Sequence, residues 1–160
     1  MKNSKLPLSL ILILTLAIAF ISCSKNSGPV YEKYLKLTNS TWDRFDVKQI
    51  EIPVNEEAVS CDITLIVRCT EQFQSDKIPF YVILTSPKGE ESIREISIPV
   101  RENGKLIAEP KESKAESRLI LWKNFSMADK GKYKITIENL IPKIQTEGIG
   151  EIGIVVTKAK

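Results

Sequence analysis

The segment from Val59 to Cys69 alternates apolar and polar residues more regularly than any other part of the chain. Its odd-numbered positions hold Val, Cys, Ile, Leu, Val and Cys, and its even-numbered positions are polar except for Ile66. Because successive side chains of a β-strand point to opposite faces, this pattern predicts a strand with one buried and one solvent-facing side. An amphipathic helix would instead place its apolar residues three and four positions apart.

The same two-residue period extends along most of the remaining chain and predicts an all-β fold. Further strands are expected at residues 50–54, 80–85, 96–100, 119–122, 133–137 and 152–156. No stretch sustains an apolar stripe at helical spacing, and the charged segment Glu109–Ser117 is expected to be a loop with room for one helical turn. About eight short strands predict an antiparallel β-sandwich, of either jelly-roll or immunoglobulin-like topology.

Two turns between these strands have sequences with a known conformational preference. Ser86-Pro87-Lys88-Gly89 has Ser first, Pro second and Gly fourth, which favours a type I turn. Asn103-Gly104 follows the strand expected at 96–100. It favours the type I′ turn of a β-hairpin, because both residues tolerate a positive φ.

The first residues of the chain predict a targeting segment rather than part of the fold. Leu8–Ile21 is a 14-residue apolar run broken by only two polar residues, whereas a membrane-spanning helix needs about 20 apolar residues. The run is followed by Ser22-Cys23, a small residue before a cysteine, as in a bacterial lipobox. We therefore expect a lipoprotein signal peptide at 1–22, a lipidated tether at 23–30 and one β-sandwich domain at 31–160. An ordinary secretory signal with an incidental cysteine is the alternative.

Acylation of Cys23 with palmitate-type chains would anchor the protein stably in a membrane. Ser24, in place of Asp, favours the outer membrane, and the lack of acidic residues in 24–29 favours its periplasmic face. Removal of the signal peptide takes two lysines with it and lowers the formal net charge from +3 to +1. A nearly neutral domain gives no indication of nucleic acid as a partner.

The chain contains no histidine. This excludes Ser-His-Asp and Cys-His catalysis and any metal site built on histidine. The acidic pairs Glu56-Glu57 and Glu90-Glu91 lie in expected loops, without the convergent partners that acid–base catalysis or a metal requires. We therefore expect a non-enzymatic protein without a metal or another cofactor.

Cys61 and Cys69 are the two thiols that remain after acylation of the first cysteine. They lie eight positions apart on one expected strand, which separates their Cα atoms by roughly 26 Å. A disulfide requires less than about 7 Å. Their shared parity places both on the apolar face, so we expect two free, buried thiols.

A short motif predicts a structural corner. Asp129-Lys130-Gly131-Lys132-Tyr133 matches the D-x-G-x-Y pattern that precedes a strand in immunoglobulin-like sandwiches. In those domains the tyrosine hydroxyl forms a hydrogen bond with the backbone and fixes the connection between the sheets. We expect Asp129, Gly131 and Tyr133 to have this structural role rather than a catalytic one.

The segment 31–45 combines aromatic and charged residues close to the expected tether. Protein interfaces favour aromatic and arginine anchors surrounded by polar groups. The candidate interaction residues are Tyr31, Tyr34, Trp42, Arg44 and Phe45. Two placements of Trp42 remain open, the edge of the core and an interface, whereas Trp122 is expected in the core.

The order of these parts resembles the GldH-type gliding-motility lipoproteins of Bacteroidota. The resemblance covers about Val30 to Lys158 and rests on the order and spacing of short segments. They are Cys23, Tyr31-Glu32-Lys33-Tyr34, Trp42, Ile63–Arg68, Thr70–Asp76, Leu84–Gly89, Gly131-Lys132-Tyr133 and Gly148–Ile154. Glu102–Ser117 departs from the family pattern, because it is polar and lacks an aromatic residue expected after the Asn103-Gly104 turn.

The resemblance implies an envelope lipoprotein associated with the gliding apparatus and its linked secretion machinery, without enzymatic activity. Two functions follow as hypotheses. The first is a non-enzymatic accessory lipoprotein that binds other envelope proteins. The second is a carbohydrate- or ligand-binding module tethered to the outer membrane, for which the aromatic residues of segment 31–45 would have to form an exposed platform.

Overall fold

The computed structural model describes residues 28–55, 59–108 and 113–159. The expected signal peptide and the expected lipidation site Cys23 lie outside the described residues, and so do residues 109–112 of the expected charged loop. Within the described ranges, no helix is both long enough and apolar enough to cross a membrane.

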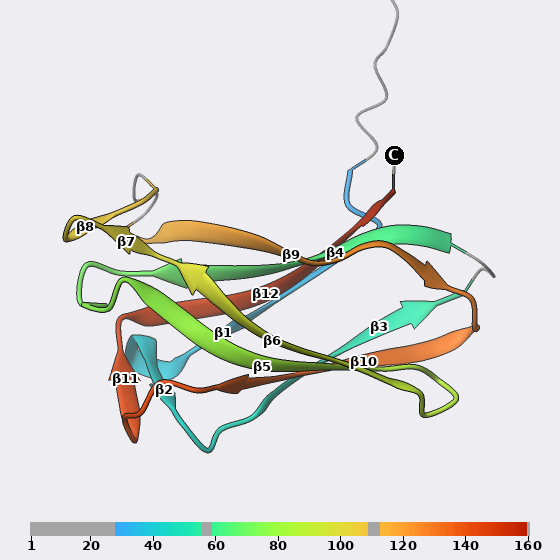
Figure 1. The fold of residues 1–160 in the computed structure, drawn as a ribbon, viewed down its shortest axis with the longest axis horizontal. Coiled ribbons are helices and arrows are strands. Elements are labelled where there is room, and N and C mark those ends of the chain that lie inside the picture. The colour runs from blue at the N-terminus through green and yellow to red at the C-terminus, as the bar shows by residue number, and fades with distance from the viewer. Residues whose placement is uncertain (1–27, 56–58, 109–112, 160) are drawn as a thin grey trace, which may run out of the picture.

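Two four-stranded antiparallel sheets lie face to face and make up most of the structure (Figure 1). The first sheet contains, in spatial order, β1 (Tyr31–Lys36), β12 (Ile149–Lys158), β4 (Val59–Cys69) and β9 (Ala115–Met127). The second contains β3 (Lys48–Val54), β10 (Gly131–Asn139), β5 (Lys77–Thr85) and β6 (Glu91–Pro99). The smaller elements are the 3-10 turn η2 (Thr38–Ser40), the pair β2 (Thr41–Asp43) and β11 (Gln145–Glu147), and the pair β7 (Arg101–Glu102) and β8 (Lys105–Leu106).

The connections between the long strands define a jelly roll. Among the long strands of the described residues, only β5 and β6 follow one another along the chain and pair within one sheet. Each of the other connections between long strands crosses from one sheet to the other. This interleaving of two Greek keys is the jelly-roll arrangement, and it decides between the two topologies left open above. The prediction of an antiparallel β-sandwich is confirmed.

The core between the sheets contains the alternating residues of β4. Its odd-numbered side chains from Cys61 to Cys69 are buried, and both cysteines are free thiols, as predicted. Burial raises the pKa of Cys61 to about 11 and that of Cys69 to about 12, so both thiols are protonated and weakly nucleophilic at neutral pH. Trp122 is also buried, and its indole N–H donates a hydrogen bond to the Ser92 hydroxyl at 3.0 Å.

Both predicted turns are present. The Gly89 N–H donates to the Ser86 carbonyl at 3.0 Å, which closes the turn between β5 and β6. Asn103 and Gly104 have φ angles of 51° and 75° and connect β7 to β8. The positive φ at both positions is the feature that a type I′ turn requires.

Two stretches differ from the expectation. β1 forms at Tyr31–Lys36, where no strand was expected, and its side chains are half-buried or exposed. β9 is longer than the expected 119–122 strand, and it includes Ala115–Ser117, which were expected in a loop. Both strands lie at an edge of the first sheet. An edge strand is more exposed to solvent, so its sequence alternates less clearly than that of a central strand such as β4.

Candidate functional site

The predicted corner forms at one end of the sandwich. The Asp129 N–H donates a hydrogen bond to the Tyr133 hydroxyl at 3.2 Å, the kind of contact that the motif suggests. Gly131 has a φ of 132°, and a Cβ there would lie 3.0 Å from the Cβ of Pro87. Lys88 and Asp129 form an ion pair at 2.6 Å. These contacts join the β5–β6 turn to the β9–β10 turn and are structural in character.

Trp42 belongs to the core and not to an exposed interface. Its side chain is 0% exposed, and its ring centroid lies 5.8 Å from that of Phe80. Its indole N–H donates to the backbone oxygen of Asp46 at 2.8 Å. The prediction of Trp42 as an interaction residue is therefore wrong. In the short strand β2 the middle side chain points inward, where burial of a large ring is most favourable.

The two tyrosines of β1 have separate surroundings. The Tyr31 hydroxyl donates to the backbone oxygen of Glu51 at 2.6 Å, which joins β1 to β3 across one side of the sandwich. Tyr34 packs over Gly153 on the outer face of the first sheet, with the Arg68 guanidinium 4.4 Å from its ring centroid. Burial raises the pKa of both phenols. The predicted interaction residues consequently do not form one surface.

A network of charged side chains lies on the same outer face. Buried Glu151 accepts hydrogen bonds from Arg68 at 2.6 Å and from Lys114 at 2.8 Å, and Arg68 also donates to Glu116 at 2.9 Å. Burial alone would raise the pKa of Glu151, but the hydrogen bonds from Lys114 and Arg68 hold it below its ordinary value. Ile66, the apolar residue on this side of β4, is 0% exposed. The network ties three strands together and fits a structural role.

The end of the sandwich opposite the corner is held together by a buried arginine. Arg101 is 7% exposed. Its guanidinium donates to the backbone oxygen of Gly104 at 2.6 Å and also to the backbone oxygen of Phe73. It also donates to the backbone oxygen of Glu71 at 2.8 Å and to the Glu71 carboxylate at 2.7 Å. These bonds join the β4–β5 loop to the β7–β8 hairpin and supply the partners that a buried charge requires.

Gly148 makes close backbone contacts at the same end of the sandwich. It has a φ of 86°, and a Cβ at this position would lie 2.1 Å from the backbone nitrogen of Phe73. Its N–H donates to the Ser40 carbonyl at 2.8 Å, and its carbonyl accepts a hydrogen bond from the Thr70 N–H at 2.8 Å. One backbone position therefore contacts two loops, and only glycine fits there.

Two neighbouring loops at this end expose apolar side chains. Phe45, between β2 and β3, is 78% exposed, and Ile144, before β11, is 70% exposed. Arg44 and Lys143 precede them and are exposed as well. The Arg44 N–H donates to the Ile144 carbonyl at 2.8 Å, which holds the two loops side by side. We call Arg44, Phe45, Lys143 and Ile144 the tip, and we call the end of the sandwich opposite the corner the tip end.

The loop that carries Phe45 is held by its own hydrogen bonds. The Phe45 N–H donates to the Asp43 carboxylate at 2.9 Å, and the Asp46 N–H donates to the Asp43 carbonyl at 3.0 Å. From inside the core, the Trp42 indole N–H binds the carbonyl of Asp46. Trp42 thus positions the loop that exposes the next aromatic residue along the chain.

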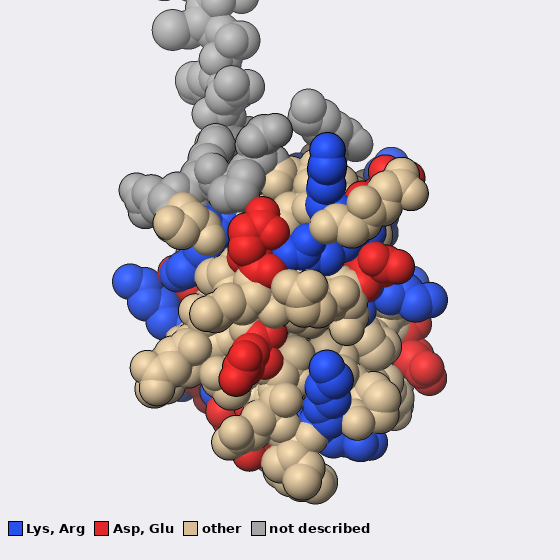
Figure 2. All heavy atoms as spheres, turned by 90° about the vertical axis from the view of Figure 1, so that its left-hand side faces the viewer, with Lys and Arg blue, Asp and Glu red and all other residues tan. Residues whose placement is uncertain are grey.

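The surface of this end mixes both signs of charge. Figure 2 shows acidic and basic residues interleaved with uncharged ones, and no large patch of one sign. The aromatic residues of segment 31–45 do not form a platform here either. Trp42 is buried, Tyr31 and Tyr34 are half-buried in separate places, and Phe45 alone among these four is exposed. The condition stated above for a carbohydrate-binding module is not met by these residues.

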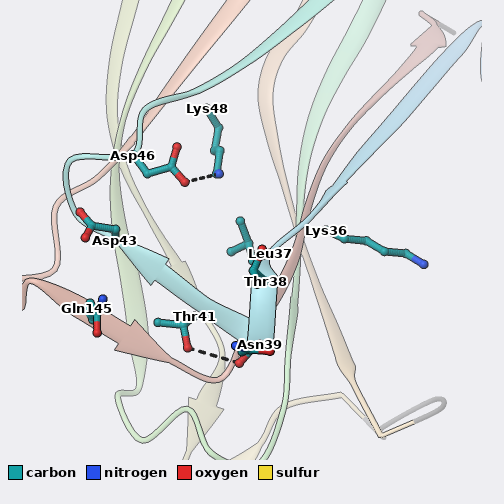
Figure 3. A pocket seen from close by; sticks show the side chains of 9 residues that line it. All are labelled: Lys36, Leu37, Thr38, Asn39, Thr41, Asp43, Asp46, Lys48 and Gln145. Carbon is teal, nitrogen blue, oxygen red and sulfur yellow. Dashed lines mark hydrogen bonds and ion pairs between the residues drawn. The ribbon is translucent and has the colours of Figure 1, made fainter.

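A polar hollow of about 360 Å³ lies beside the tip (Figure 3). Its lining residues are Lys36, Leu37, Thr38, Asn39, Thr41, Asp43, Asp46, Lys48 and Gln145. Asp46 and Lys48 form an ion pair, whereas the Lys36 side chain extends away from the others (Figure 3). Among the described residues, no group of three or more His, Cys, Asp or Glu side chains could hold a metal ion. The hollow offers hydrogen-bonding groups rather than a metal site.

Together, the fold and its surface define a jelly-roll domain whose loops at one end are joined by hydrogen bonds and expose Phe45 and Ile144. The family model described as GldH lipoprotein matches residues 29–156, and the chain belongs to this family. The match spans both sheets, the corner and the tip, and it confirms the resemblance noted from the sequence. The family is not an enzyme family, and membership implies a lipid-anchored, membrane-associated protein connected with gliding motility.

Comparison with solved structures finds distant similarities. AlgX of Pseudomonas aeruginosa has a TM-score of 0.41 and 11% identity over 85% of this chain, which spans 27% of the AlgX chain. The Eiger TNF of S. frugiperda has a TM-score of 0.38 and 8% identity, over 82% of this chain and 95% of that one. Neither similarity is close enough to carry an inference. The comparison with curated proteins returns no significant match.

Proposed function

We propose that this chain is a non-enzymatic accessory lipoprotein of the gliding or secretion machinery, and that it binds another envelope protein through the tip. In this proposal acylated Cys23 holds the protein at the periplasmic face of the outer membrane, and residues 23–30 connect the anchor to β1. Family membership supports the lipid anchorage and the connection with gliding motility. The exposed apolar residues of the tip supply the proposed means of binding a partner protein.

The observation that carries the proposal is that Phe45 is exposed on a loop held in place by hydrogen bonds. Its side chain is 78% exposed, yet its loop is held by hydrogen bonds from within and from the neighbouring loop. A pre-ordered anchor loses little conformational freedom on binding, so more of the contact energy remains as affinity. Covering Phe45 and Ile144 would also remove apolar surface from water. Aromatic side chains with an arginine beside them are typical anchors of protein interfaces.

Site-specific photo-crosslinking tests the proposal. A photoreactive amino acid replaces Phe45 in the full chain, and the protein is irradiated in its native cells. We expect a discrete cross-linked product with one envelope protein, identified by mass spectrometry. Ile93 on β6 is the matched control, because it is 50% exposed on an edge strand of the second sheet and far from the tip in sequence.

A product of the same kind and yield from position 93 would mean that the tip is not a specific surface. The complete lack of a protein product from position 45, with the variant present at its normal level, would contradict the proposal directly. A product that contains glycan in place of protein would support the carbohydrate-binding alternative.

The anchor is tested separately. Cys23→Ala should leave the protein in a soluble or unprocessed precursor fraction, because no thiol remains for acylation at that position. Mass spectrometry of the membrane fraction should find acylated Cys23 as the first residue of the mature chain. An unmodified Cys23 in membrane-bound protein would contradict this part of the proposal.

A further inference from the structure

The two loops of the tip present the same pair of chemical groups. Arg44 precedes Phe45 and Lys143 precedes Ile144, and all four side chains are exposed. Within the described residues, neither Arg44 nor Lys143 forms an ion pair, whereas nearby Lys48 pairs with Asp46. Each exposed apolar residue therefore directly follows, in the sequence, a cation without an ion-pair partner among the described residues.

The acidic groups of the same loop are engaged within the loop. The Asp43 carboxylate accepts the Phe45 N–H at 2.9 Å, and the Asp46 carboxylate pairs with Lys48. Their contacts fix the backbone that presents Phe45. The Asp43 carboxylate keeps its charge but is directed to the backbone of its own loop, whereas Arg44 and Lys143 form no ion pair within the described residues.

The tip lies on the opposite side of the domain from the entry of the chain. Residues 28–30 enter β1 at the top of Figure 1, and the loops before β3 and before β11 lie at its bottom. A tether of eight residues spans at most about 28 Å. A domain suspended from this tether presents the tip away from its anchoring membrane, which favours a protein over a lipid surface as the occupant.

We propose that the tip binds an acidic and apolar segment of an envelope protein. Carboxylates of this segment meet Arg44 and Lys143, and its apolar side chains cover Phe45 and Ile144. The inference rests on the proposed function, because it names the chemistry of the partner for the same surface. Complementary charge at the rim gives specificity and speeds association, and the apolar pair supplies the buried area.

Peptide selection tests this inference. Random 12-residue peptides displayed on phage are selected on the full-length protein in detergent micelles. We expect enriched peptides to combine Asp or Glu with Leu, Phe or Trp. The double variant Arg44→Glu, Lys143→Glu should bind the enriched peptides about tenfold more weakly or worse. The binding to wild type should weaken as salt is raised.

Lys105→Glu, Lys123→Glu is the matched control, because it reverses two exposed lysines elsewhere on the domain. It should bind the peptides as wild type does, and both double variants should melt at the wild-type temperature. Enriched peptides without acidic residues would overturn the inference, and so would equal affinity for wild type and the tip variant.

Two further outcomes bear on the inference. If unacylated Cys23→Ala protein binds vesicles that contain phosphatidylglycerol, and Phe45→Ser abolishes this binding, the occupant is a lipid surface and the inference fails. If the Phe45 cross-link to an envelope protein persists at full yield in the charge-reversed variant, the recognition of acidic groups fails. The proposed protein-binding function survives that second result.

Discussion

The two ends of the sandwich are held together in different ways. At the corner, the Asp129 N–H binds the hydroxyl of Tyr133, which is four residues away in the chain. At the tip end, Arg101 binds the carbonyl of Phe73, which is 28 residues away. The corner contact can form as soon as its own turn forms. The tip-end contact forms only when separate loops have been brought together by the two sheets.

If the tip binds a partner as proposed, this difference gives a reason for its position, because the surrounding loops are joined by contacts between distant parts of the chain. Arg101 links the β4–β5 loop to the β7–β8 hairpin, and Gly148 links the β4–β5 loop to η2. The corner joins the β5–β6 turn to the β9–β10 turn, and neither of these turns, both within the described residues, exposes a large apolar side chain. We therefore expect substitutions at the tip end to cost more free energy of unfolding than substitutions at the corner, and to disturb binding as well.

The largest expected effect separates two glycines with the same backbone angle. Gly148 at the tip end has a φ of +86° and Gly89 at the corner end a φ of +87°, but only Gly148 is crowded. Gly89→Ala should cost about 1 kcal/mol, the ordinary penalty of this conformation. Gly148→Ala should cost about 4 kcal/mol or more, because its Cβ would overlap the Phe73 backbone. Urea denaturation monitored by circular dichroism measures both.

Equal costs for the two glycine variants would show that the loops at the tip end can relax around an added methyl group. The tip end would then be no stiffer than the corner. If Gly148→Ala does not fold at all while Gly89→Ala does, the comparison stands in its strongest form.

The second prediction concerns the buried guanidinium. Arg101→Met keeps the aliphatic part of the side chain but leaves the carbonyls of Phe73 and Gly104 and the Glu71 carboxylate without their donor. We expect a loss of about 3 kcal/mol in the free energy of unfolding. Arg94→Met is the control, because Arg94 is exposed and lies 5.6 Å from the Trp122 ring centroid. It should cost less than about 1 kcal/mol.

A cost for Arg101→Met as small as that for Arg94→Met would mean that the loops at the tip end are held by backbone contacts alone. Thermal and urea denaturation of the two variants under one set of conditions decide this point.

The third prediction links the core to the tip. Trp42→Phe keeps an aromatic ring in the core but removes the donor to the Asp46 carbonyl and leaves a small cavity. We expect a loss of about 2 kcal/mol in the free energy of unfolding. The cross-link yield from position 45 should also fall, because the loop loses the bond that fixes it from inside. An unchanged yield with reduced stability would show that the remaining loop bonds suffice to present Phe45.

The sequence predicted the parts of this molecule that are encoded locally. The alternation of β4, the Ser86–Gly89 turn, the Asn103-Gly104 turn and the two buried thiols all follow from residues a few positions apart. The corner motif belongs to the same class, since its contact spans four residues. Each of these features depends on residue types whose local preferences are strong.

The candidate surface was only partly accessible to the same reasoning. Arg44 and Phe45 were singled out and are exposed, but Trp42 beside them is buried. Composition does not distinguish the two aromatic residues, because the inward direction of Trp42 depends on the pairing of β2 with β11. Ile144 carries no motif, and it joins the tip through one backbone contact between distant loops.

The smallest expected effect belongs to the corner and completes the comparison. Tyr133→Phe removes the hydroxyl that accepts the Asp129 N–H at 3.2 Å but keeps the buried ring. Because one partly buried donor loses its partner, we expect a cost of about 1 kcal/mol in the free energy of unfolding. The cross-link from position 45 should keep its full yield, since the tip is held by other contacts. A loss of stability as large as that for Arg101→Met, or a weakened cross-link, would show that the corner and the tip end form one cooperative unit. The order of the tip would then depend on the whole sandwich rather than on its own loops.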